Sequence, residues 1–220
     1  MQFVRPTYQY LLRRSAEFRF ILHGKYRSYP IPESGMFPRE TTDFLTSKIT
    51  GKKFLEFGSG GSTKYFSNYA FSVTSIETDK FFAKNVTREC AGKSNVEIIY
   101  SNIGPTKSYG QPITFLRPFM KKRYLQYPLL PWSLRFTKYD VILVDGRFRV
   151  SCAMQSVIHN PKPFLLIIDD YADRPEYRAI QQALNSHPLI VGKTAFFQIE
   201  QNVNLSICEE TYENFKFKVA

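Results

Sequence analysis

Short apolar runs alternate with longer amphipathic stretches along most of the chain, beginning near residue 53. This alternation is typical of a parallel sheet with helices packed on it. The pattern predicts strands near 53–57, 72–76, 96–100, 140–144 and 164–168, and helices near 63–69, 80–91, 149–158 and 175–185. Residues 188–200 alternate well enough for one or two further strands, with a hairpin turn at Gly192 and Lys193.

A glycine-rich loop follows the first predicted strand, with the sequence Gly58-Ser59-Gly60-Gly61-Ser62-Thr63. Glycines at the end of a strand let the backbone turn tightly and approach a ligand closely. The second predicted strand ends at Glu77, at the spacing where a carboxylate accepts hydrogen bonds from both hydroxyls of a ribose. The two features together predict a site for a nucleotide-like cofactor.

The loop differs from the dinucleotide-binding pattern, because Thr63 stands where that pattern has its third glycine and Glu56 precedes the first. An acid in a buried strand is costly unless it meets a positive group. Here the sequence resembles the class I S-adenosylmethionine-dependent methyltransferases, whose first motif is an acidic residue followed by Gly-x-Gly. The resemblance covers about residues 38–197 and includes the runs 55–63, 75–79, 103–106, 144–149 and 168–171. It implies an α/β protein with a three-layer Rossmann-like fold, in which a mostly parallel sheet carries an antiparallel edge strand.

The resemblance also implies how S-adenosylmethionine would bind as the cofactor. Glu77 would contact its ribose, and Asn102 and Ile103, after the third strand, would lie near its adenine. Asp145 would lie near its amino group and the reacting centre. The amino-acid part of the cofactor would contact the glycine loop and its flanking acid, that is Glu56, Gly58, Ser59, Gly60, Ser62 and Thr63.

Three aspartates follow the fourth and fifth predicted strands: Asp145, Asp169 and Asp170. The resemblance makes these strands neighbours, about 4.8 Å apart, so their carboxylates are expected to converge. This arrangement is similar to that of catechol O-methyltransferase-type enzymes, and oxygen ligands suit Mg²⁺ or Mn²⁺. The lysine that those enzymes place three residues after the first aspartate is Phe148 here. A metal-independent role in acid/base chemistry or acceptor binding is the alternative.

The charge of the chain favours an anionic partner, since 30 basic residues against 19 acidic ones give a net charge of +11. Residues 104–138 hold seven basic residues and no acidic one. This segment is too long for an ordinary connection between two strands, so we expect an insertion or lid. Arg147 and Arg149 are candidates to hold a carboxylate or phosphate of the acceptor. A small anionic acceptor is the preferred partner, and nucleic acid or an anionic membrane surface are the alternatives.

Length and composition predict a single catalytic domain, 51–220, after a helical extension, 1–50. A basic amphipathic helix near residues 8–20 is expected either to pack over the domain or to lie on a membrane surface. No apolar run reaches the length needed to cross a bilayer and no secretory leader is evident, which predicts a cytoplasmic protein. The three cysteines are widely spaced and are expected to be reduced thiols, namely Cys90, Cys152 and Cys208.

These observations together predict an enzyme that transfers the methyl group of S-adenosylmethionine to an oxygen or nitrogen. The expected catalytic residues are Asp145, Asp169, Asp170 and Arg147. A nicotinamide-dependent oxidoreductase is one alternative, which the missing third glycine and Glu56 disfavour. A non-catalytic module that binds S-adenosylmethionine and docks on RNA or membrane is the other.

Overall fold

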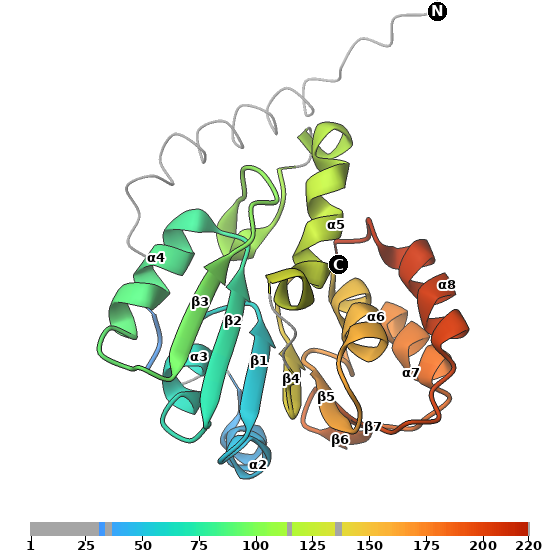
Figure 1. Ribbon diagram of the computed structural model, residues 1–220, viewed down its shortest axis with the longest axis horizontal. Helices are drawn as coiled ribbons and strands as arrows, with labels where there is room; N and C mark the ends of the chain where they lie inside the picture. The colour runs from blue at the N-terminus through green and yellow to red at the C-terminus, as the bar shows by residue number, and fades with distance from the viewer. Residues whose placement is uncertain (1–30, 34–36, 114–115, 135–137, 220) are drawn as a thin grey trace, which may run out of the picture.

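The computed structural model describes residues 31–33, 37–113, 116–134 and 138–219, which form a seven-stranded sheet between helices (Figure 1). The strands lie in the order β3-β2-β1-β4-β5-β7-β6. Strands β1 to β5 are parallel, and β7 runs antiparallel to both of its neighbours. Their bounds are β1 Lys53–Phe57, β2 Ser72–Glu77, β3 Val96–Tyr100, β4 Val141–Val144, β5 Phe164–Ile168, β6 Leu189–Val191 and β7 Thr194–Ile199.

The order of the strands reverses at β1, which pairs with β2 on one side and with β4 on the other. In open parallel sheets, ligands bind beyond the carboxyl ends of the strands at this reversal. The sequence-predicted site residues all lie at the ends of β1 to β5, in the loops that follow them, or in the first turns of α3 and α6. The fold therefore brings these residues to one edge of the sheet.

Helices cover both faces of the sheet. Helix α2 and helix α3 contribute to the core on one face, and α4 packs beside α3 over β2 and β3. Residues of α5, α6, α7 and α8 contribute to the core on the opposite face. The bounds are α2 Arg39–Ile49, α3 Gly61–Phe66, α4 Lys80–Glu89, α5 Arg117–Leu134, α6 Arg149–His159, α7 Arg178–Leu184 and α8 Leu205–Phe215, with short 3₁₀ helices at Ser108–Gly110 and Pro175–Tyr177.

Alternate residues of the central strands supply these two cores. Phe54 of β1 packs with residues of α2 and α3, whereas Leu55 and Phe57 pack with residues of the opposite helix layer. A parallel sheet that is covered on both faces needs apolar side chains in both directions. This explains why short, nearly continuous apolar runs predicted β1, β3 and β5 with the observed bounds.

Three helices depart from the sequence prediction. Helix α5 occupies much of the segment predicted as an insertion, although Pro128 and Pro131 lie inside it. No helix was predicted there, and a proline inside a helix removes one of its hydrogen bonds. Helix α8 lies in a stretch without a clear period. Helix α2 lies in the predicted extension but buries Leu45 and Ile49 in the core, whereas the helix predicted near 8–20, with its membrane contact, lies outside the described residues.

In the carboxyl-terminal third, the predicted hairpin is confirmed, whereas the predicted start of the helix before it is wrong. Strands β6 and β7 form the predicted hairpin, with Gly192 in the left-handed region at φ 60°. The helix predicted near 175–185 instead begins as the 3₁₀ turn Pro175–Tyr177, which has no side-chain cap, and Asp173 before it pairs with Lys193 Nζ at 2.5 Å. After α8 the backbone returns to the strand ends, where Val219 accepts a hydrogen bond from the Phe148 N–H at 3.3 Å.

Two general expectations concern the described residues as a whole. Cys90, Cys152 and Cys208 are buried and form no disulfide, as predicted. Across the part of the chain that the structure describes, none of the helices has the length and apolar character that a bilayer span requires.

Candidate functional site

The glycine loop after β1 touches the loop after β4. Gly58 adopts φ 101°, a left-handed conformation, and its N–H donates to the carbonyl of Ile76 at 2.9 Å. A Cβ at Gly58 would lie 2.8 Å from the Cα and N of Gly146. The close approach of these two loops therefore requires a residue without a side chain at position 58.

Glu56 lies beneath this loop and is fully buried. Its carboxylate accepts hydrogen bonds from Ser62 Oγ, from Thr63 Oγ1 at 2.5 Å and from Ser75 Oγ at 3.0 Å. Burial raises the pKa of Glu56 to about 7, although the three hydroxyl donors oppose that shift. Glu56 thus fixes the start of α3 and the glycine loop from below. The hydroxyls of Ser62 and Thr63, predicted to contact the cofactor, point to Glu56.

Glu77 ends β2 and joins it to the glycine loop. Its carboxylate accepts backbone N–H bonds from Ser59 at 3.0 Å, from Thr78 at 2.6 Å and from Asp79 at 2.8 Å. Burial raises its pKa to about 7, against the effect of the backbone donors. Oε1 accepts the Thr78 and Asp79 N–H groups and also lies 3.4 Å from Thr78 Oγ1, whereas Oε2 accepts the Ser59 N–H and has a second lone pair for a ligand hydroxyl. This geometry fits the ribose role that the sequence predicts.

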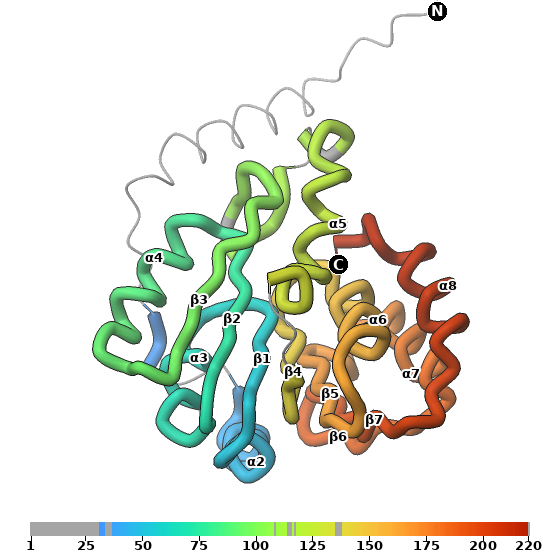
Figure 2. The backbone as a smooth tube through the Cα atoms, in the orientation of Figure 1, coloured from blue at the N-terminus to red at the C-terminus, as the bar shows by residue number. Residues whose placement is uncertain are grey.

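A short turn, residues 108–110, covers the end of β2. Thr78 Oγ1 donates to the carbonyl of Gly110 at 3.2 Å, and a Cβ at Gly110 would lie 2.1 Å from that Oγ1. The carbonyl of Tyr109 accepts a hydrogen bond from Arg147 Nε at 2.8 Å. The 108–110 turn is therefore held between the loops after β2 and β4. Figure 2 shows the segment that contains it, in green, extending past the ends of β2 and β3.

Asn102 and Ile103 follow β3, where the adenine is predicted to bind. Asn102 Oδ1 accepts hydrogen bonds from the Gly104 N–H at 3.1 Å and from Arg123 Nη1 of α5 at 3.2 Å. The Ile103 side chain is buried in the core on the α5 side of the sheet. These contacts anchor α5 beside the end of β3, and adenine binding by the two residues stays a prediction.

The three aspartates after β4 and β5 do converge, as predicted, but they converge on Arg149 at the start of α6. Arg149 Nη2 lies 2.9 Å from Asp145 Oδ1 and 3.3 Å from Asp170 Oδ2, and Nη1 lies 3.9 Å from Asp169 Oδ2. The Arg149 side chain is only 7% exposed. We call Arg149 and the three aspartates the arginine cluster.

The structure gives the predicted metal site no support. Among the described residues, which include all three aspartates, no group of three or more His, Cys, Asp or Glu side chains is placed to hold a metal ion. The physical reason is that a guanidinium already lies between the carboxylates and supplies the positive charge that a metal would supply. Asp169 is further engaged by Thr194 Oγ1, which donates to Asp169 Oδ1 at 2.8 Å.

The electrostatics of the arginine cluster single out Asp145. Burial and the nearby Asp169 carboxylate raise the pKa of Asp145 well above its usual range, although Arg149 lowers it. The Asp145 side chain is 33% exposed. For Arg147, burial and the adjacent Arg149 lower the pKa of the guanidinium. The sequence signal for the Asp145–Arg149 pair was their spacing of four residues.

Two buried tyrosines that the sequence did not point to lie beside the Gly146 loop and the arginine cluster. Tyr127 of α5 is buried, and a Cβ at Gly146 would lie 2.3 Å from its hydroxyl oxygen. Tyr177 is fully buried, with Arg149 Cζ 5.9 Å from its ring centroid. The strand order, the glycine loop and the acid at the end of β2 together define a Rossmann-like protein of the methyltransferase class.

Comparisons with known proteins agree with this class. A methyltransferase-like protein (spo2022) from Silicibacter pomeroyi DSS-3 superposes with a TM-score of 0.74 at 30% identity, over 85% of this chain and 98% of that one. Cofactor-bound Rv0187 from MTB shares the fold, with a TM-score of 0.52 at 13% identity over 90% of this chain and 100% of that one. No family model and no curated protein matches the chain. The chain belongs to the class I S-adenosylmethionine-dependent methyltransferases, among their small methyltransferase-like proteins.

Proposed function

We propose that the protein transfers the methyl group of S-adenosylmethionine to an oxygen or nitrogen of a small anionic acceptor. The observation that carries the proposal is the joint geometry of the glycine loop and Glu77, in which the Ser59 N–H binds the carboxylate that ends β2. A Cβ at Gly60 would meet no atom within 4 Å, so the loop has open space beside it. Glu77 Oε2 accepts the Ser59 N–H and has a second lone pair for a ribose hydroxyl. These residues fit the cofactor.

The chain's own residues account for the remaining requirements of methyl transfer. Bound S-adenosylmethionine supplies an activated methyl group on its sulfonium. The raised pKa of Asp145 supports a role as the group that takes the proton of the acceptor hydroxyl or amine. Arg147 would orient an anionic group of the acceptor through its terminal nitrogens, since its Nε donates to the Tyr109 carbonyl of the 108–110 turn.

Calorimetric titration with S-adenosylhomocysteine and then with NAD tests the proposal. We expect S-adenosylhomocysteine to bind and NAD to give no heat at the same concentration. Binding of NAD alone would identify an oxidoreductase and overturn the proposal. Binding of S-adenosylhomocysteine without transfer to any acceptor would favour the non-catalytic module.

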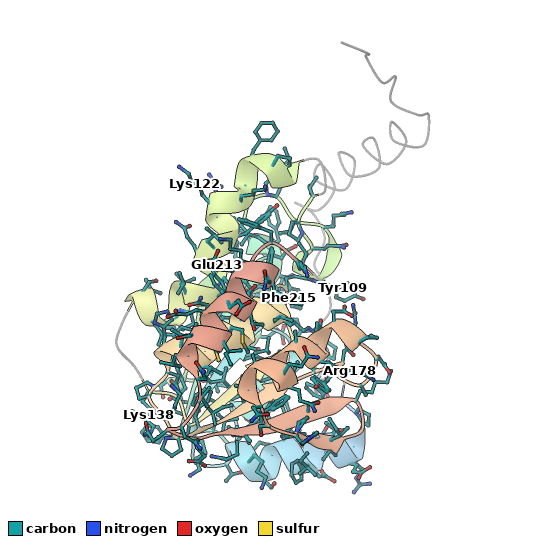
Figure 3. All side chains as sticks on the ribbon, turned by 90° about the vertical axis from the view of Figure 1, so that its right-hand side faces the viewer. Tyr109, Lys122, Lys138, Arg178, Glu213 and Phe215 are labelled. Carbon is teal, nitrogen blue, oxygen red and sulfur yellow. The ribbon has the colours of Figure 1, made fainter. Side chains whose placement is uncertain are left out.

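The basic surface of α5 supports the anionic nature of the acceptor. Lys121 and Lys122 are exposed on this helix, near Arg123, which reaches the end of β3. Lys121 Nζ also lies 5.2 Å from the ring centroid of Phe217. Figure 3 shows Lys122 on the part of α5 that stands away from the body of the protein.

Replacing Lys121 and Lys122 together with Ala is expected to leave the affinity for S-adenosylhomocysteine within about twofold while lowering methyl transfer to an anionic acceptor. The loss should shrink as salt is added, because exposed charges are screened. The measurement is transfer of labelled methyl to a panel of small phosphate- and carboxylate-bearing compounds, with RNA as a comparison.

The matched control replaces Lys53 and Lys138 with Ala, which removes the same charge. Both lysines are exposed, and Lys138 lies at the opposite end of the protein from Lys122 (Figure 3). The control should transfer as the wild type does. Equal losses in both variants would mean that overall charge matters, and a loss confined to RNA would identify a different acceptor.

A further inference from the structure

Arg149 connects the ends of two neighbouring strands through their backbone. Its Nε donates to the carbonyl of Gly146 at 3.0 Å, its Nη1 to that of Asp169 at 2.5 Å and its Nη2 to that of Asp145 at 2.9 Å. A guanidinium has a fixed planar set of five N–H donors, and these bonds use all three of its nitrogens. The backbone at the ends of β4 and β5 is therefore sufficient by itself to hold the Arg149 guanidinium in one position.

The same guanidinium faces the three carboxylates of the arginine cluster. Two of them lie 2.9 and 3.3 Å from Nη2, and the third lies 3.9 Å from Nη1. A divalent cation would need carboxylate oxygens at about 2.0 to 2.6 Å, on the position that the guanidinium fills. Asp170 reaches the guanidinium from a left-handed backbone, φ 55°, a conformation that costs roughly 1 kcal/mol.

We propose that Arg149 is a permanent internal cation that replaces the divalent metal expected from the resemblance to catechol O-methyltransferase-type enzymes. Its meaning for catalysis rests on the proposed function, but the replacement itself is tested without any acceptor. An arginine keeps its charge and offers only donors, so it neither binds acceptor oxygens as a metal does nor activates them. Arg149 is a positioning residue for Asp145, and orientation of the acceptor falls to Arg147.

The central experiment measures Mn²⁺ binding by electron paramagnetic resonance in the wild type and in Arg149→Met. Methionine removes the positive charge and keeps much of the length of the arginine side chain. The wild type is expected to bind Mn²⁺ no better than Asp145→Asn does. Arg149→Met leaves three carboxylates without their central cation and is expected to bind Mn²⁺ at least about tenfold more tightly than the wild type, with a higher melting temperature in its presence.

Two further variants sharpen the comparison. Arg174→Met is the matched control, because Arg174 Nη2 lies 3.9 Å from Asp170 Oδ2 but is 40% exposed at the edge of the cluster. It should acquire no Mn²⁺ binding. Arg149→Lys keeps a positive charge at the centre and should bind Mn²⁺ as weakly as the wild type, which a merely structural role for Arg149 would not predict.

Two results would overturn the proposal: Mn²⁺ binding by the wild type that Asp145→Asn abolishes, or a folded Arg149→Met that binds no Mn²⁺. If Arg149→Met does not fold, the wild type and Asp145→Asn decide, since equal absence of Mn²⁺ binding supports the proposal and a difference between them overturns it. Titration of the same wild-type sample with S-adenosylhomocysteine separates the two proposals, because its failure would remove the methyltransferase function and leave the Mn²⁺ result intact.

Discussion

Replacing Gly58 with Ala is expected to destabilise the protein by about 3 to 5 kcal/mol, the largest effect of any single substitution considered for this site. The new Cβ would lie 2.8 Å from the Cα and N of Gly146 and 3.1 Å from the carbonyl carbon of Asp145. All three are backbone atoms, so the loops after β1 and β4 would have to separate. The left-handed φ of 101° adds its own strain. Urea unfolding followed by circular dichroism measures the change.

Gly60→Ala is the matched control in the same loop. A Cβ at Gly60 meets no atom within 4 Å, and φ 173° is an extended conformation open to any residue. Its free energy of unfolding should stay within about 0.5 kcal/mol of the wild type. If Gly58→Ala proved as stable as Gly60→Ala, the close contact between the two loops would not exist in solution.

Glu77→Ala is expected to weaken binding of S-adenosylhomocysteine by on the order of 2 kcal/mol, because a hydrogen bond from a ribose hydroxyl to a charged acceptor is lost. Isothermal titration calorimetry measures this. The control is Asp79→Ala, which removes a nearby buried carboxylate that caps α4 by accepting the N–H groups of Phe81 and Phe82 at 2.9 and 3.0 Å. That variant should lose stability and keep its affinity. Unchanged affinity in folded Glu77→Ala would remove Glu77 from the site.

The same residue gives the binding a pH dependence. The pKa of Glu77 is raised to about 7 in the cofactor-free protein, and a ribose hydroxyl donates to the ionised form. The ionised fraction increases as pH rises through about 7, so affinity should increase in the same direction. Between about pH 8 and about pH 6 we expect a loss of about tenfold in the wild type and a flatter profile in Glu77→Ala.

The sheet was predictable from sequence because its physical requirement is simple. Strands covered on both faces must be apolar throughout, and Phe164–Ile168 carries no polar residue at all. Helix α5 was not predictable in the same way, because Pro128 and Pro131 contradict local helix propensity. Its buried aromatics Tyr124 and Tyr127 pack against the core, and such tertiary packing decides helix formation in a folded protein.

The positions of the site residues were predictable from sequence, but the groups that they contact were not. Parallel topology alone brings Asp145 and Asp169 to neighbouring strand ends. Their partner depends on the direction in which the side chain of Arg149 points, and a residue at a helix start is equally able to face solvent. Glu56 shows the same limit, since a buried acid demands a partner but the sequence does not reveal that three hydroxyls supply it.

The hydrogen bond between Phe148 and Val219 has a consequence for how the protein is made. On the ribosome the nascent chain emerges with β1, β2 and the glycine loop long before β4, so one edge of β1 stays unpaired during that interval. Such an apolar, unpaired edge is prone to aggregation. The loop from Asp145 to Phe148 can form its backbone hydrogen bond to Val219 only after the residues beyond α8 have been synthesised. The backbone contacts of the loops after β1 and β4 therefore depend on segments that lie far apart along the chain.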